Sequence, residues 1–188
     1  MKAKGEKIRE RIVEAANQLI YKKGFNAMSF ADVAAVVAIT KGNLHYHFNN
    51  KESLLQAVVE MRLAAIRQQL ILWDAEFSEP KQRLKRFLQM LLNEQNELVR
   101  YGCPMGSLNM ELAKQQTDLL NISRELFDAY LPWLERQFLL LKIKQSEQKA
   151  RHFLSMAQGA ALMCHVYHDQ AWLLQECVVI EQWLDSLL

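Results

Sequence analysis

The chain has 188 residues, of which 51% are hydrophobic and 23% are charged, and its formal net charge at pH 7 is +2. A chain of this length buries a sizeable core and needs no disulfide or metal to fold. Its three cysteines are an odd number without a zinc-type CxxC pair, and no apolar stretch reaches the roughly 20 residues that cross a membrane. These features argue against a disulfide-stapled or membrane protein and predict a cytoplasmic protein without a cofactor.

Basic residues are concentrated near the N-terminus. Residues 1–51 carry nine Lys or Arg against four Asp or Glu, a net charge of +5, so the remainder carries −3. Such asymmetry is typical of a module that meets a polyanion. A merely solvated basic face is the alternative that charge alone leaves open.

Helical spacing of apolar residues dominates the chain, and no segment alternates apolar and polar residues between turn signals. An all-α fold is therefore predicted. The first helix is expected to end at Lys22-Lys23-Gly24, where lysines and a glycine suit a C-terminus. Ser29 and Asp32 resemble a capping pair that starts a very short helix over residues 30–37.

A second short helix is predicted over residues 41–48, with Thr40 as its cap and Ala38-Ile39-Thr40 as the tight turn before it. Two short helices joined by such a turn, in the basic part of the chain, form the arrangement of a helix-turn-helix. A fourth helix is expected to run from Lys51 toward Trp73 and to connect two domains.

The rest of the chain predicts a larger helical bundle. With the four N-terminal helices, about nine helices are expected in total. Pro132 is expected to kink or divide one long helix. The expected segments are a helix from Pro80 to about Tyr101, a loop over 102–106, a short helix from Ser107, a long helix over 118–141, a helix from Ser146 to about His168, and a last helix through Leu173–Leu187.

The second short helix carries side chains suited to reading DNA. Gly42 removes bulk, so that the backbone can approach a phosphate or a base edge, while Leu44 and Phe48 are left to anchor the helix to the core. The hydrogen-bonding side chains in this stretch are Thr40, Lys41, Asn43, His45, Tyr46 and His47.

At these residues the sequence resembles the TetR family of bacterial transcriptional regulators. The matching segments are Val33-Ala34, Ala38-Ile39-Thr40, residues 41–48 (Lys-Gly-Asn-Leu-His-Tyr-His-Phe) and Lys51-Glu52, with Ala15-Ala16 and Gly24-Phe25 upstream. The resemblance implies a helix-turn-helix DNA-binding domain over residues 5–65, with its motif at about 29–48. It also implies a helical ligand-binding and dimerisation domain over residues 66–188.

Two positions depart from the family pattern. Ala38 replaces the usual turn glycine, so the turn either avoids positive φ or is slightly strained. His45 replaces a tyrosine that commonly contacts the DNA backbone in the family, which predicts a weaker or pH-sensitive contact. The residues expected to contact DNA, with Lys51 on a phosphate by resemblance, are Ser29, Thr40, Lys41, Gly42, Asn43, His45, Tyr46, His47 and Lys51.

The family resemblance also implies a homodimer through the last two helices. Small residues Ala157, Gly159, Ala160 and Ala161 permit close helix approach, and an apolar seam runs from Leu173 to Leu187. Two-fold symmetry would separate the reading helices by about 34–36 Å, or a multiple, on a near-palindromic double-stranded operator. The alternative is that the same seams are buried within one chain.

Large, adaptable side chains in the middle helices suit either a ligand cavity or an ordinary core. By resemblance to TetR-like repressors they predict a small-molecule inducer that shifts the dimer away from DNA. Candidate ligand contacts are Met90, Tyr101, Cys103, Phe127, Tyr130 and Trp133.

Cys103 lies between Gly102 and Pro104, and it is either a reactive sensor or an inert cysteine. Cys164, His165 and His168 share a helical face that is expected to pack, so no metal site is predicted. No catalytic motif indicates an enzyme. The favoured function is a repressor released by a small molecule or a reactive species. Activation, or a helical module that binds RNA or a membrane surface without sequence preference, is the alternative.

Overall fold

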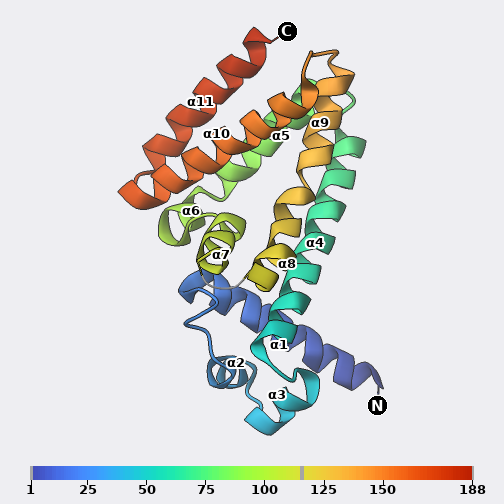
Figure 1. Cartoon of the computed structure of the whole chain (residues 1–188), viewed down its shortest axis with the longest axis vertical. Helices are drawn as coiled ribbons and strands as arrows, with labels where there is room; N and C mark the ends of the chain where they lie inside the picture. The colour runs from blue at the N-terminus through green and yellow to red at the C-terminus, as the bar shows by residue number, and fades with distance from the viewer. Residues whose placement is uncertain (1, 115–116, 188) are drawn as a thin grey trace. The chain divides into compact units, whose positions relative to one another are not determined.

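The computed structural model describes residues 2–114 and 117–187, in which every regular element is a helix (Figure 1). The all-α prediction is confirmed. The helices are α1 (Lys2–Lys23), α2 (Phe30–Val37), α3 (Lys41–His47), α4 (Lys51–Glu76), α5 (Pro80–Asn93), α6 (Gln95–Tyr101), α7 (Pro104–Leu112), α8 (Thr117–Asp128), α9 (Leu131–Leu140), α10 (Ser146–Tyr167) and α11 (Gln170–Ser186). Glu94 alone separates α5 from α6, and residues 129–130 separate α8 from α9. Counting each pair as one helix gives the nine predicted.

The chain forms two compact units. The N-terminal unit comprises Met1–Ala65 and Ser107–Leu126, and the C-terminal unit comprises Ile66–Gly106 and Phe127–Leu188. Residues 107–126 thus pack with the first 65 residues, although sequence assigned them to the second domain. The functional division, with DNA binding by residues 5–65 and ligand binding and dimerisation by residues 66–188, stays a prediction.

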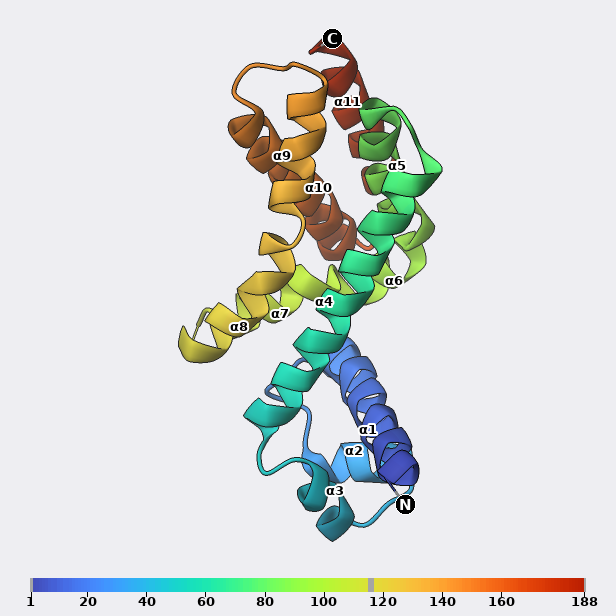
Figure 2. The same cartoon turned by 90° about the vertical axis from the view of Figure 1, so that its right-hand side faces the viewer.

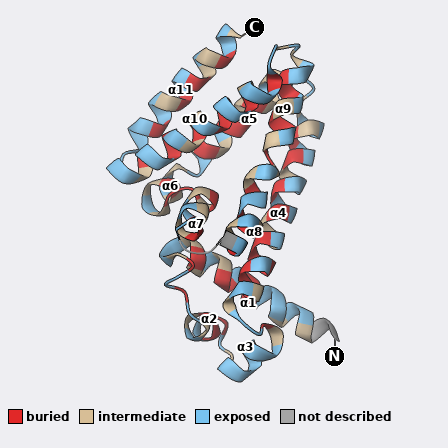
Figure 3. Ribbon diagram, viewed as in Figure 1, coloured by how far each residue is buried: buried red, intermediate tan, exposed pale blue. Residues whose placement is uncertain are grey.

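The short helices of the N-terminal unit are held by buried apolar residues, whose positions are red on the ribbon of Figure 3. Arg11 of α1 adds a polar link, because its guanidinium donates to the Val37 carbonyl at the end of α2, at 2.8 Å. An eight-residue helix such as α2 is unstable alone, so this burial is what keeps it folded. The fully buried core residues include Ile12, Ala16, Val33, Leu44, Leu54, Leu55 and Val58.

A capping box starts α2, as the sequence predicts. The Asp32 amide donates to the Ser29 hydroxyl at 3.2 Å, and the Ser29 amide donates to the Asp32 carboxylate at 3.0 Å. The Ser29 hydroxyl and amide both donate to the carboxylate and thereby lower the pKa of Asp32. Each donor that the first turn leaves unsatisfied is costly, and this pair satisfies two of them.

The turn between α2 and α3 adopts the left-handed conformation at Ala38, with φ 57° and ψ 49°. Of the two alternatives for this position, the structure has the strained one. The Ile39 amide donates to the Ala34 carbonyl at 3.0 Å, and the Ala38 amide donates to Ala35 at 3.2 Å, a pattern that ends a helix in a left-handed residue. The alanine side chain therefore occupies a backbone position that favours glycine.

Helix α10 is the centre of the C-terminal unit and packs against α6, α9 and α11. Helices α10 and α11 lie side by side in both views (Figures 1 and 2). Phe153 of α10 packs between α5 and α9, since its ring lies 5.5 Å from that of Phe87 on α5 and 6.1 Å from that of Phe138 on α9. All three phenylalanines are at most 1% exposed, so they form the middle of this core.

The seam predicted for a second copy is buried within the chain itself. Leu173, Cys177, Ile180 and Leu184 are at most 2% exposed, and so are Ala157 and Ala161, because α10 and α11 use these faces against their neighbours. The apolar residues that α10 and α11 leave exposed lie on other faces. They are Leu162, Met163, Val166, Tyr167, Trp172, Leu174, Val178 and Val179, which we call the outer apolar face.

None of the described helices is long and apolar enough to cross a membrane.

The conformation of Ala38 predicts opposite effects for two glycine substitutions in the same turn of chain. Ala38→Gly relieves the left-handed strain and is expected to leave the free energy of unfolding unchanged or to raise it by up to about 1 kcal/mol. Ala35→Gly, at an exposed helical position, is expected to lower it by about 1 kcal/mol. Urea unfolding followed by circular dichroism measures both. Equal losses would contradict a left-handed Ala38 in solution.

Candidate nucleic-acid interface and ligand site

Helix α3 is capped by Thr40 and anchored by two apolar residues. The Thr40 hydroxyl accepts from the Asn43 amide at 3.2 Å, and the Phe48 amide closes the helix on the Leu44 carbonyl at 2.9 Å. Leu44 is fully buried and Phe48 is 4% exposed, which confirms their predicted role as anchors. The burial of one side of so short a helix turns its other side outward.

The polar side of α3 is open to solvent. Tyr46 is 85% exposed, the highest value among the large hydrophobic residues that the structure leaves exposed. His45 packs on Phe30 of α2, with ring centroids 5.0 Å apart, and so keeps a fixed place beside the start of α2. Of the residues predicted to contact DNA, His47 and Lys51 are half-buried, and the exposed ones are Ser29, Thr40, Lys41, Gly42, Asn43, His45 and Tyr46.

A hollow of about 460 Å³ lies where the start of α2, the side of α3 and the start of α4 meet. The first turn of α2 supplies backbone N–H groups of the kind that bind anions. The loop before α2 and residues at or next to the three helices line the hollow, namely Asn26, Ala27, Met28, Ser29, Phe30, His45, Asn50 and Lys51. A second hollow, of about 280 Å³, is lined by Arg9, His47, Phe48 and the first turns of α4.

Lys51 holds the loop that follows α1. Its ammonium donates to the carbonyls of Phe25, at 2.7 Å, and Asn26, at 3.2 Å, and lies 4.6 Å from the centre of the Phe25 ring. In this structure the lysine therefore contacts protein carbonyls. Its predicted contact with a phosphate stays a prediction.

Glu111 of α7 binds the backbone N–H groups of the same loop. The amides of Phe25 and Asn26 each donate to one oxygen of the Glu111 carboxylate, both at 2.8 Å. Gly24 has φ +86°, and a Cβ there would lie 2.9 Å from a Glu111 oxygen. Glycine is thus required by both the backbone and the close carboxylate. Nothing in the local sequence indicated this role, because Glu111 is 86 residues from its partner.

The sequence also missed the cap of α4. The Ser53 amide donates to the Asn50 side-chain oxygen at 2.8 Å, and the Ser53 hydroxyl donates to the Asn50 carbonyl at 2.9 Å. Asn at the cap position is a recognisable signal, although the pair Asn49-Asn50 indicated only a break between helices.

In the C-terminal unit, several predicted ligand residues lie close together. The Tyr130 hydroxyl donates to the Met90 sulfur at 3.9 Å, and the Tyr130 ring meets that of Phe87 edge-on at 5.4 Å. Burial, with a smaller contribution from the neighbouring Cys103 thiol, raises the pKa of Tyr130. Cys103 is 8% exposed, and its sulfur accepts from the Gly106 amide at 3.4 Å. Met90, Cys103 and Tyr130 are therefore neighbours.

The other predicted ligand residues have different surroundings. Trp133 is 7% exposed and packs on Trp73 at 5.7 Å between ring centroids. Tyr101 ends α6 and Phe127 lies on α8, and both are half-buried. For all six residues, contact with a ligand stays a prediction.

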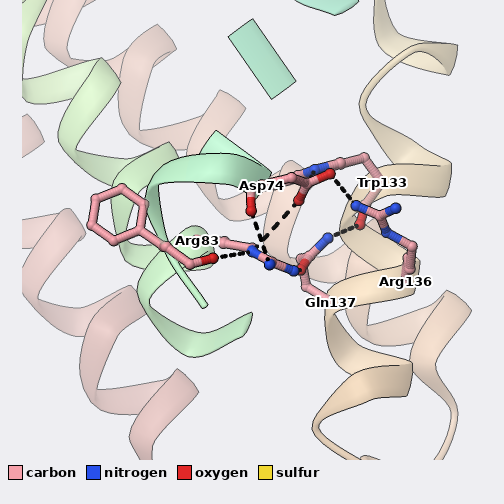
Figure 4. A network of polar contacts seen from close by, with 6 residues as sticks. Asp74, Arg83, Trp133, Arg136 and Gln137 are labelled. Carbon is pink, nitrogen blue, oxygen red and sulfur yellow. Dashed lines mark hydrogen bonds and ion pairs between the residues drawn. The ribbon is translucent and has the colours of Figure 1, made fainter. Parts of the chain in front are cut away.

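Asp74 is the centre of a polar cluster beside Trp133 (Figure 4). Its carboxylate accepts from the Trp133 indole at 3.1 Å and pairs with Arg83 at 3.5 Å and with Arg136. Arg83 also donates to Gln137, which is fully buried and donates in turn to the Trp133 carbonyl at 3.0 Å. The carboxylate thus links α4 with α5 and α9.

The other two cysteines are buried thiols. Burial is the first cause that raises the pKa of Cys177, to about 11, and it also raises that of Cys164. His165 and His168 both direct Nδ1 to the Val99 carbonyl, at 2.9 and 3.3 Å, which assigns them to the contact between α10 and α6. No three His, Cys, Asp or Glu residues gather as a possible metal site within residues 2–114 and 117–187.

Comparison with known proteins agrees with the geometry of the N-terminal unit. Residues 12–58 match the family model of bacterial regulatory proteins of the tetR family. An uncharacterised HTH-type transcriptional regulator of Lactococcus lactis is 28% identical over 166 residues, which cover 86% of this chain and 85% of the relative. The HTH-type transcriptional repressor BepR of Brucella suis is 24% identical over 84% of this chain and 80% of its own length.

The whole chain also has the fold of solved regulators. A TetR transcriptional regulator from Legionella pneumophila superposes with a TM-score of 0.83 and is 26% identical, over 92% of this chain and 95% of that one. The α2–turn–α3 arrangement, the match over residues 12–58 and this likeness across both units agree with one another. The chain belongs to the TetR family of transcriptional regulators, whose members bind DNA through this helix-turn-helix.

Proposed function

We propose that the protein is a transcriptional repressor that binds a near-palindromic operator as a homodimer and is released by a small-molecule or reactive-species inducer. Its place of action is then the cytoplasm, where the DNA is. The observation that carries the proposal is the outward polar side of α3, where Lys41, Asn43 and Tyr46 are exposed while Leu44 is buried. A helix held from behind by its apolar side is suited to enter the major groove.

The exposed residues of α3 divide into two kinds. Asn43 presents hydrogen-bonding groups of the type that reads base edges, whereas Thr40, Lys41, His45 and Tyr46 suit phosphate oxygens. A phosphate also fits the hollow beside α3, because Lys51 brings a positive charge there and the first turn of α2 brings N–H groups. Phosphate contacts orient the helix, and base contacts select the operator.

The outer apolar face of α10 and α11 supports the proposed dimer. Val166, Tyr167, Val178 and Val179 are each more than half exposed, and Tyr167 stacks on Trp172 with ring centroids 4.7 Å apart. Gly159 has open space where a Cβ would lie, so a second helix has room to approach closely there. So many exposed apolar residues on two helices are unusual on a monomer.

Two substitutions on α3 test its contact with DNA. Tyr46→Ala and Lys41→Ala are each expected to weaken operator binding by about tenfold or more while the dimer persists, because both side chains are exposed and support nothing in the core. Fluorescence anisotropy with labelled operator measures the affinity, and light scattering measures the mass. Lys144→Ala, an exposed lysine far along the chain, is the matched control. Unchanged affinity in both variants would contradict the assigned interface.

Glu111 tests whether the loop after α1 positions the helix-turn-helix. Glu111→Gln leaves one of two amides without its carboxylate oxygen and is expected to cost about 1–2 kcal/mol of stability. Faster hydrogen exchange at Phe25 and Asn26, with weaker DNA binding, is the expected signature. Glu125→Gln, exposed on α8, is the control. Unchanged hydrogen exchange at both amides would show that Glu111 does not bind them in solution.

A charge on the outer apolar face is expected to dissociate the dimer. Val166→Glu or Val178→Glu would bury a carboxylate in the proposed interface, and light scattering should then give the monomer mass. Ile71→Glu places the same charge at an apolar site on α4 that is 61% exposed and outside this face. A dimer that survives both valine substitutions would place the interface elsewhere.

A further inference from the structure

Arg86 of α5 has a buried guanidinium nitrogen without a partner. Its Nη1 is shielded from solvent and finds no hydrogen-bond acceptor among the residues that the structure describes. The guanidinium lies over the ring of Trp73, 5.2 Å from its centre, and Trp73 is only 2% exposed. A buried N–H of a charged group is costly when it is left unpaired. Such a group is therefore expected where another molecule supplies the acceptor.

The carboxylate of Asp74 is shared among donors other than Arg86. Asp74 follows Trp73 in the chain, yet its oxygens are taken by the Trp133 indole and by two other arginines, Arg83 and Arg136 (Figure 4). One negative charge thus already serves two positive ones, and Arg86 adds a third positive charge beside Trp73. The described contacts leave this region with a surplus of positive charge, which favours an anion.

Aromatic side chains connect Arg86 with a second weakly satisfied donor. The ring of Phe87 meets Trp73 at 6.4 Å on one side and Tyr130 at 5.4 Å on the other. The Tyr130 hydroxyl donates to the Met90 sulfur, a weak acceptor. Met90 is one helical turn after Arg86 on α5 and is half-buried, and its unbranched side chain repacks easily. Arg86, Tyr130 and Met90 are therefore linked to one another through the rings of Trp73 and Phe87.

We propose that this region binds a small aromatic carboxylate. Arg86 pairs with the carboxylate group, and the Tyr130 hydroxyl is a second hydrogen-bond donor. Met90 and the aromatic rings pack against the apolar part of the ligand. A planar carboxylate matches the two-pronged geometry of a guanidinium. A single negative charge on an apolar body also loses less hydration than a phosphate would in such surroundings. The proposal deepens, and rests on, the proposed function as a ligand-responsive regulator.

Binding is tested with benzoate, salicylate, phenylacetate and 4-hydroxybenzoate as probes on the full chain, by calorimetry and by tryptophan fluorescence. At least one carboxylate is expected to bind saturably, and its neutral amide, benzamide for benzoate, is expected to bind about tenfold or more weakly. Arg86→Met is expected to remove the binding, whereas Arg67→Met, at an exposed arginine of α4, keeps it. Failure of all four carboxylates, or equal binding by amide and acid, overturns the proposal.

The stability of Arg86→Met gives a second readout that needs no ligand. Removal of a guanidinium that holds one buried, unpaired nitrogen is expected to leave the melting temperature unchanged or higher. A lower melting temperature with undiminished carboxylate binding would mean that a buried water alone satisfies Nη1 and that Arg86 is structural, which overturns the proposal.

DNA binding by the same preparations separates this inference from the proposed function. Arg86→Met without ligand is expected to bind operator as the wild type does. Wild-type protein that binds DNA but no carboxylate refutes the inference alone. Wild-type protein that binds a carboxylate through Arg86 but no DNA refutes the repressor and leaves the site standing.

Discussion

The burial of Leu44 and Phe48 is the interaction on which the DNA-reading surface depends. Helix α3 has seven residues, fewer than an isolated helix needs for stability, so it exists only because its apolar side is held in the core and its ends are capped. Because that side is fixed in the core, Lys41, Asn43 and Tyr46 on the rest of the helix surface are exposed to solvent. The contacts that stabilise the helix therefore also determine which side chains it exposes.

The backbone around α3 is held by contacts from several elements. Arg11 of α1 reaches the end of α2, while Lys51 of α4 and Glu111 of α7 hold opposite edges of the loop after α1. A loop whose carbonyls and amides are both fixed has little freedom to shift the start of α2. Pre-organisation of this kind reduces the entropy that DNA binding must overcome.

Local chemistry was predictable from sequence, and long-range pairing was not. The Ser29–Asp32 box and the Thr40 cap depend on residues three apart, so their spacing is visible in the chain. Glu111 meets its partners across 85 and 86 residues, and no local pattern encodes that contact. The seam from Leu173 to Leu187 was recognised as packing, but periodicity gives only the buried face of a helix, not the partner that buries it. The unpaired Nη1 of Arg86 was invisible for the same reason.

The central claim is sequence-specific DNA recognition by α3, and selection from genomic DNA tests it most directly. Purified protein is incubated with genomic fragments at moderate salt against excess random duplex, and the retained fragments are sequenced. The account predicts enrichment of a near-palindromic site whose half-sites are one helical turn, about 34–36 Å, or a multiple of it apart. Uniform recovery without an enriched site would contradict it, because a basic helical surface without base contacts binds all duplexes alike.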